Sequence, residues 1–185
     1  MRTFLFALLL SLAGTSAALD KAAVEKLAFG ESEERTAALA ALVAEADPRA
    51  VPLLQALSEG EMQTAAGRVL IVKGGQASDA ITGEKVDPLP EGAEDVVANN
   101  RLRREIEGAL AAFKLLSPER AVRLAAAKQL ASGADASMLG LVRKALENES
   151  DAGIKPLLEL TAASMEMKSG DKAARIAAIQ RLGDS

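Results

Sequence analysis

The 185-residue chain is 49% hydrophobic and 26% charged, carries a net charge of −4, and contains no cysteine, histidine, tryptophan or tyrosine. A chain of this length can bury a core, and its acidic balance offers no general attraction to nucleic acid or to an anionic membrane surface. The missing residue types exclude disulfides, thiol chemistry, histidine general-base catalysis and nearly all transition-metal sites. We therefore expect no cofactor, no metal and no nucleic-acid partner.

The first 18 residues have the three-part pattern of a secretory signal peptide. A positive charge at Arg2 precedes an apolar run over residues 4–12, and small residues fill the end of the segment. The run has about nine residues, too few to span a bilayer core of roughly 30 Å. We expect cleavage after Ala17 or Ala18, export to the periplasm and a mature domain over residues 19–185. The alternative is an apolar helix that is retained in the fold.

Helical periodicity starts directly after this segment. Asp20 is a suitable N-cap for a short helix that ends before Gly30. Two further helices are predicted over residues 32–45 and 48–58. Pro52 falls in the first turn of the second of these, where the missing N–H is least costly.

Residues 59–99 interrupt the helical pattern. Glycines and prolines mark turns throughout this segment, and a run of Arg-Val-Leu-Ile-Val-Lys is its one β-rich stretch. We predict a β-hairpin from residues 62–64 and 68–72, followed by a second, weaker turn at residues 82–84. A long insertion between short-looped helices is more often functional than accidental.

The helical pattern resumes near residue 100 with the only local basic cluster of the chain, formed by Arg101, Arg103 and Arg104. One interpretation is a solvated helix face with ion pairs to Glu105 and Glu107. The other is a surface that contacts an acidic partner, and these three arginines are the candidate contact residues.

A two-helix unit over residues 117–146 is repeated along the chain. Ser117 and Pro118 predict the N-cap and first position of its first helix, and the short connection predicts an antiparallel hairpin. Asp47 and Asp135 precede the second helices at the same offset. The sequence thus predicts an all-α fold, a HEAT-like alpha solenoid of antiparallel helix pairs with a small β-hairpin insertion. The repeated pattern is Arg35, Ala38, Leu39 and Leu42; Arg123, Ala126, Ala127 and Leu130; and Arg175, Ala178, Ile179 and Leu182.

Two short motifs indicate ligand binding only weakly. Residues 73–75 (Lys-Gly-Gly) lack the Lys-Ser/Thr ending and the directly following helix of a phosphate loop. Glu147, Glu149 and Asp151 alternate like calcium ligands, but the glycine of an EF-hand loop is out of position. A turn in which Asp151 caps the next helix is the better explanation.

Several segments, taken in order, resemble a known family. Arg-x-Ala-Ala repeats ahead of Asp-Pro-Arg-Ala-Val-Pro-Leu-Leu (47–54) are similar to HEAT-type repeats. Ala-Ile-Thr-Gly-Glu (80–84), Val-Ala-Asn-Asn-Arg-Leu-Arg-Arg (97–104) and Leu-Leu-Ser-Pro (115–118) extend the likeness. Across its whole length the chain resembles the N-terminal extracytoplasmic region of the urea ABC-transporter permease of the UrtB type. Within the 97–104 segment, Asn-Asn-Arg-Leu-Arg-Arg is the most specific match.

This resemblance implies a non-catalytic, periplasmic helical-repeat module of a urea transporter permease that makes protein–protein contacts during urea uptake. A periplasmic urea-binding protein and transporter subunits are the implied partners. The membrane permease domain of the family is missing, so we expect a truncated form of an inner-membrane-attached protein, and no substrate residue carries over. The alternative is a free-standing periplasmic HEAT-repeat scaffold. An enzyme is not expected, because no convincing nucleophile–base or acid pair is present.

Overall fold

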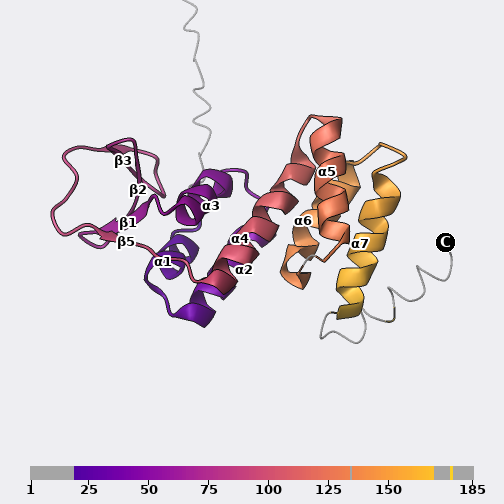
Figure 1. Ribbon diagram of the computed structural model, residues 1–185, viewed down its shortest axis with the longest axis horizontal. Helices are drawn as coiled ribbons and strands as arrows, with labels where there is room; N and C mark the ends of the chain where they lie inside the picture. Colours follow the sequence, from indigo (N-terminus) through magenta and orange to yellow (C-terminus); the bar gives the residue numbers. More distant parts are fainter. Residues whose placement is uncertain (1–18, 134, 169–175, 177–185) are drawn as a thin grey trace, which may run out of the picture.

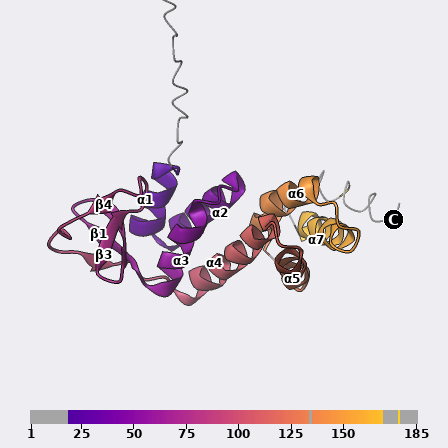
Figure 2. The same ribbon diagram turned by 90° about the horizontal axis from the view of Figure 1, so that it is seen from above.

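The computed structural model describes residues 19–133, 135–168 and 176. Within them the chain forms seven α-helices and a five-stranded antiparallel sheet, so the predicted all-α solenoid is wrong and the fold is mixed α/β. The molecule is elongated, with the sheet at one end, α4 in the middle and α7 toward the other end (Figure 1, Figure 2). The predicted cleavage residues Ala17 and Ala18 and the predicted last helix over residues 171–182 fall outside the described residues, apart from position 176.

The first three helices follow the predicted boundaries closely. They are α1 (Lys21–Phe29), α2 (Ser32–Glu45) and α3 (Ala50–Glu59). The carboxylates of Asp20 and Asp47 each accept a hydrogen bond from the backbone N–H two residues later, at 3.0 and 2.9 Å. Asp20 is the N-cap of α1, as predicted, whereas Asp47 closes the turn before α3, whose N-cap Arg49 makes no side-chain cap hydrogen bond.

Four helices follow the sheet: α4 (Asn100–Phe113), α5 (Arg120–Ala131), α6 (Leu139–Asn148) and α7 (Lys155–Lys168). Single turns of 3-10 helix precede α5 and α6.

The start of α5 lies two residues later than predicted. The hydroxyl of Ser117 accepts a hydrogen bond from the N–H of Glu119 at 3.2 Å, so Ser117 closes the turn before the helix instead of capping it. Pro118 belongs to the same turn. The carboxylate of Asp135, by contrast, accepts a hydrogen bond from the N–H of Ser137 at 2.9 Å and caps the turn that leads into α6, as predicted.

The helices form two equivalent groups of three. Within the first group α2 packs on α1, and within the second α5 packs on α4. The first group meets α4 through α2 and α3, just as the second group meets α7 through α5 and α6. We call α1–α3 and α4–α6 the first and second units. Pairs of buried residues at equivalent positions are Ala38 and Ala126, Leu42 and Leu130, Leu53 and Leu141, and Leu54 and Val142.

The predicted antiparallel pairs are therefore wrong in their partners. Helices α2 and α3 do not pack closely along their lengths, and neither do α5 and α6. The apolar stripe of α2 is covered instead by the buried face of α1, which contains Val24 and Leu27. Periodicity shows that a helix has an apolar face, but it does not show which neighbour covers that face.

The insertion at residues 59–99 folds into the sheet, in the order β4-β3-β2-β1-β5. The predicted hairpin is confirmed as β1 and β2, and the predicted turn at residues 82–84 lies between β3 and β4. Gly74 and Gly75, with φ of 58° and 79°, form the tight β2–β3 turn, which explains the Lys-Gly-Gly motif. The strands are β1 (Met62–Ala65), β2 (Arg68–Lys73), β3 (Gln76–Asp79), β4 (Lys85–Val86) and β5 (Glu94–Asp95).

Each face of the sheet buries its own set of side chains. Val69 points toward the side that packs on α1 and α3, and it joins their core together with Met62. Leu70 points the opposite way, because successive residues of a strand face opposite sides. It is fully buried with Ala65 and Ala77 but does not belong to the helical core. The sheet thus has a small core of its own.

Two alanine substitutions at neighbouring positions test this division. We expect Leu70→Ala to lower the free energy of opening of the sheet amides by about 2–5 kcal/mol, because it removes the centre of the separate core. Faster hydrogen exchange should then stay within the sheet. Val69→Ala should also speed exchange in α1 and α3, and an identical exchange pattern in both variants would contradict the two-core description.

Candidate functional site: two arginine clasps and a basic surface

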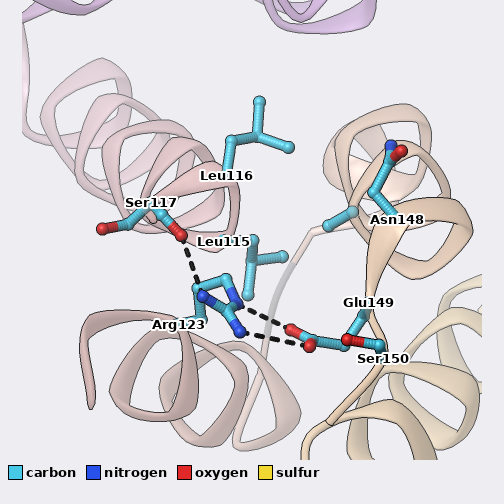
Figure 3. Close-up of a pocket in the computed structure, with 8 residues that line it drawn as sticks. Leu115, Leu116, Ser117, Arg123, Asn148, Glu149 and Ser150 are labelled. Atoms are coloured by element: carbon cyan, nitrogen blue, oxygen red, sulfur yellow. Dashed lines mark hydrogen bonds and ion pairs between the residues drawn. The ribbon is translucent and has the colours of Figure 1, made fainter. Parts of the chain in front are cut away.

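The most extensively bonded side chain of the second unit is Arg123, in the first turn of α5. Its Nη1 donates to the carbonyl oxygens of Ser117 and Pro118, at 3.1 and 3.0 Å. Its Nε and Nη2 donate to the two carboxylate oxygens of Glu149, at 2.8 and 3.2 Å (Figure 3). One guanidinium therefore joins the start of α5 to the turn before it and to the segment that leads into α7.

A second ion pair lies one helical turn earlier. Arg120 donates from Nε and Nη2 to Asp151, at 2.6 and 3.2 Å. Asp151 also caps α7, since its carboxylate accepts hydrogen bonds from the N–H groups of Gly153 and Ile154. This confirms the predicted cap. We call Arg120, Arg123, Glu149 and Asp151 the closed clasp.

The two acids of the closed clasp are held in their charged forms. The hydrogen bond from Arg123 is the main cause that holds the pKa of Glu149 below its ordinary value, and Arg120 does the same for Asp151. Glu149 is only 3% exposed and Arg123 is 21% exposed, so water competes little for this pair. Both acids are engaged by arginines and backbone, which leaves neither of them free to act as a general base.

A recess of about 360 Å³ adjoins the closed clasp (Figure 3). Leu115, Leu116 and Ala145 supply its apolar wall, while Asn148 and Ser150 supply neutral polar groups. Within the described ranges, no group of three or more Asp or Glu residues is arranged to hold a metal ion. The recess therefore offers an apolar wall, neutral polar groups and the ion pair of Arg123 with Glu149, with no nucleophile–base pair in its lining.

The first unit contains an equivalent arrangement built around Arg35, which occupies the place of Arg123. Its Nε and Nη2 donate to the carbonyl oxygens of Gly30 and Ala28, at 2.8 and 2.9 Å. Its Nη1 donates to the carbonyl oxygen of Val97, at 2.9 Å, in the segment that leads into α4. The guanidinium thus ties the unit to the turn before α2 and to the next helix, as in the second unit.

The second contact of this arrangement is also equivalent. The side-chain amide of Asn99 donates to the hydroxyl of Ser32 at 3.2 Å, and its oxygen caps α4 by accepting from the N–H of Leu102 at 2.8 Å. Ser32 and Asn99 stand where the second unit has Arg120 and Asp151. We call Ser32, Arg35, Val97 and Asn99 the open clasp, because no carboxylate of the described residues forms an ion pair with Arg35.

The three arginines predicted from sequence lie within the first five residues of α4, and their surroundings differ. Arg101 pairs with Glu105 at 2.9 Å, which confirms one of the two predicted ion pairs. The Nε of Arg103 donates to the carbonyl oxygen of Ala98 at 3.2 Å. Arg104 has no polar partner among the described residues. We call Arg101, Arg103 and Arg104 the basic surface.

The structure brings only part of the basic surface to one recess. Arg101 and Arg104 line a hollow of about 240 Å³ together with Gly108 and Asp135. Arg103 points instead toward the segment that contains Val97. Sequence reasoning missed Arg35 as a neighbour of this region, although its place in the repeated Arg pattern was visible.

No protein-family model, curated protein sequence or solved structure matches this chain. None of the helices among the described residues is long and apolar enough to cross a membrane.

The closed clasp predicts a dependence of stability on pH. Because the pKa of Glu149 is lowered in the folded state, its contribution is complete above the ordinary glutamate pKa of about 4.3 and is lost as the pH falls below it. We expect Glu149→Gln to lower the midpoint of thermal unfolding at pH 7, and this deficit should shrink toward pH 3.

The matched control is Glu147→Gln, which removes an exposed carboxylate two residues earlier. Its midpoint should follow that of the unaltered protein at every pH. A deficit in Glu149→Gln that is the same at pH 7 and pH 3 would show that the ion pair does not contribute to stability.

Proposed function

We propose that this protein is a non-catalytic module that binds another protein through the basic surface. The observation that carries the proposal is Arg104, whose guanidinium lacks a carboxylate partner among the described residues and stands at a recess in an otherwise acidic chain. An uncompensated arginine beside a hollow suits an acidic side chain of a partner.

The architecture supports binding over catalysis. In the closed clasp each acid is engaged by an arginine and by backbone N–H groups. In the recess of the basic surface, Glu105 is paired with Arg101 and Asp135 is engaged as a helix cap. General acid–base catalysis needs a proton donor or acceptor that can reach a substrate, and the acids that line the two recesses are engaged in structural contacts.

The resemblance of residues 97–104 to the urea permease region supports a narrower proposal. According to this narrower proposal, the protein acts in the periplasm as a component of urea uptake. Its partners are the periplasmic urea-binding protein or the transporter subunits. The basic surface belongs to this same segment, and therefore the most specific part of the resemblance coincides with the proposed contact.

Binding kinetics test both levels of the proposal. We expect Arg101→Gln/Arg104→Gln to slow association with the urea-binding protein or the permease by about tenfold at low salt, because surface charges mainly steer encounter. The effect should fade at high salt. The matched control Lys128→Gln/Lys155→Gln removes two exposed charges elsewhere and should leave the rate unchanged.

The two levels fail in different ways. Absence of binding between the unaltered protein and both candidate partners would overturn the assignment to urea uptake. Binding that proceeds equally fast with and without Arg101 and Arg104 would overturn the role of the basic surface.

A further inference from the structure

In both clasps the arginine binds carbonyls of the turn before its helix, and the two clasps differ in the group that it binds in the following segment. In the closed clasp Glu149 is 3% exposed and pairs with Arg123. The equivalent residue of the open clasp is Val97, whose carbonyl binds Arg35 and which is 68% exposed. One unit therefore supplies its own carboxylate, and the other presents an apolar side chain and an arginine.

Arg35 keeps donors that its carbonyl contacts do not use. A guanidinium has five N–H groups, and three of them are satisfied by Gly30, Ala28 and Val97. Two therefore remain, one on Nη1 and one on Nη2, whereas Glu149 takes its two from Nε and Nη2 of Arg123. A carboxylate is the group that a planar arginine fork binds best.

Exposed apolar residues flank the backbone partners of this arginine along the chain. Phe29 stands between the two α1-end residues whose carbonyls bind Arg35, and it is 52% exposed. The other phenylalanine of the described residues, Phe113, is 6% exposed, so an aromatic at the surface is unusual in this protein. Ser117 takes the place of Phe29 in the second unit. The open clasp is thus more apolar than the closed one, and the charge of its arginine is not neutralised by a carboxylate.

Two arginines without an ion pair lie beside Val97. Arg35 and Arg103 bind the successive carbonyls of Val97 and Ala98, and neither arginine forms an ion pair among the described residues. Of the acids nearest along the chain, Glu34 accepts a hydrogen bond from the N–H of Glu31 at 3.0 Å, and Asp95 accepts one from the side-chain amide of Gln63 at 2.9 Å. Glu94 is exposed.

We infer that the open clasp binds an acidic segment of the partner protein, with a Glu or Asp carboxylate on Arg35 and an adjacent apolar side chain against Val97 and Phe29. The carboxylate of the partner neutralises Arg35 as Glu149 neutralises Arg123, through the N–H groups of Nη1 and Nη2 that remain. This inference rests on the proposed function, because it assumes that an acidic partner binds near α4, and it adds a specific arginine and an apolar contact to that surface.

A matched pair of peptides tests the inference by nuclear magnetic resonance. The probes are N-acetyl-Leu-Glu-amide and N-acetyl-Leu-Gln-amide, titrated into the full protein while the side-chain Nε–H signals of the arginines are followed. We expect the Glu peptide to shift the Arg35 signal saturably and the Gln peptide to leave it unchanged. Equal responses to the two peptides, or no response at Arg35, would overturn the inference.

The same titration separates this inference from the proposed function. A Glu-dependent shift at Arg104 without one at Arg35 would leave the basic surface standing and overturn the open clasp as a docking site. A shift at neither arginine would count against both.

Val97→Glu provides an internal mimic of the docked state. It places a carboxylate where the second unit has Glu149, so it should raise the thermal midpoint and abolish the shift of Arg35 by the Glu peptide. The control Val97→Gln removes the apolar side chain without adding a charge, and it should weaken the shift without raising the midpoint. Undiminished peptide binding in Val97→Glu would overturn the inference even if the variant is well folded.

Discussion

The arrangement of the helices depends on an arginine in the first turn of the second helix of each unit. The end of a helix leaves backbone carbonyls without intrahelical partners, and a long, planar guanidinium can reach several of them at once. Arg35 and Arg123 both do so, donating to carbonyls five to seven residues earlier in the chain. Each also reaches forward to the segment before the next unit or α7. The same side chain therefore fixes the turn within a unit and the junction that follows.

The insertion accounts for the difference between the two junctions. In the second unit a short segment leads from α6 to α7, and it carries Glu149 and Asp151 to the arginines. In the first unit the sheet lies between α3 and α4, and the chain returns from β5 with Val97 and Asn99 in those places. Both junctions keep a contact with the arginine and a capping side chain, a backbone carbonyl binding Arg35 and a carboxylate binding Arg123. Only the first leaves an arginine without a carboxylate, which makes it the junction able to accept one from another molecule.

Local features of the fold could be predicted from the sequence, whereas the pairing of its elements could not. The cap at Asp20 and the turn that Asp151 closes before α7 depend on residues within three positions, so residue type and spacing suffice. Strands β4 and β5 have two residues each and no apolar alternation, so they leave no signal. The predicted pairing of the helices was wrong, because the periodicity of a helix shows its apolar face but does not identify the helix that packs on it. The basic cluster was found, but the role of Arg35 depends on the fold, which brings it to Val97 across the whole insertion.

The most direct measurement compares the thermal unfolding of Arg35→Lys, Arg123→Lys and Arg104→Lys. Lysine keeps the charge but lacks the planar fork, so it cannot satisfy several carbonyls in fixed directions. If the clasps hold the units together, the first two variants will unfold at clearly lower temperatures than the unaltered protein, while Arg104→Lys will unfold at the same temperature. Midpoints for Arg35→Lys and Arg123→Lys that match that of Arg104→Lys would contradict the role of the two arginines.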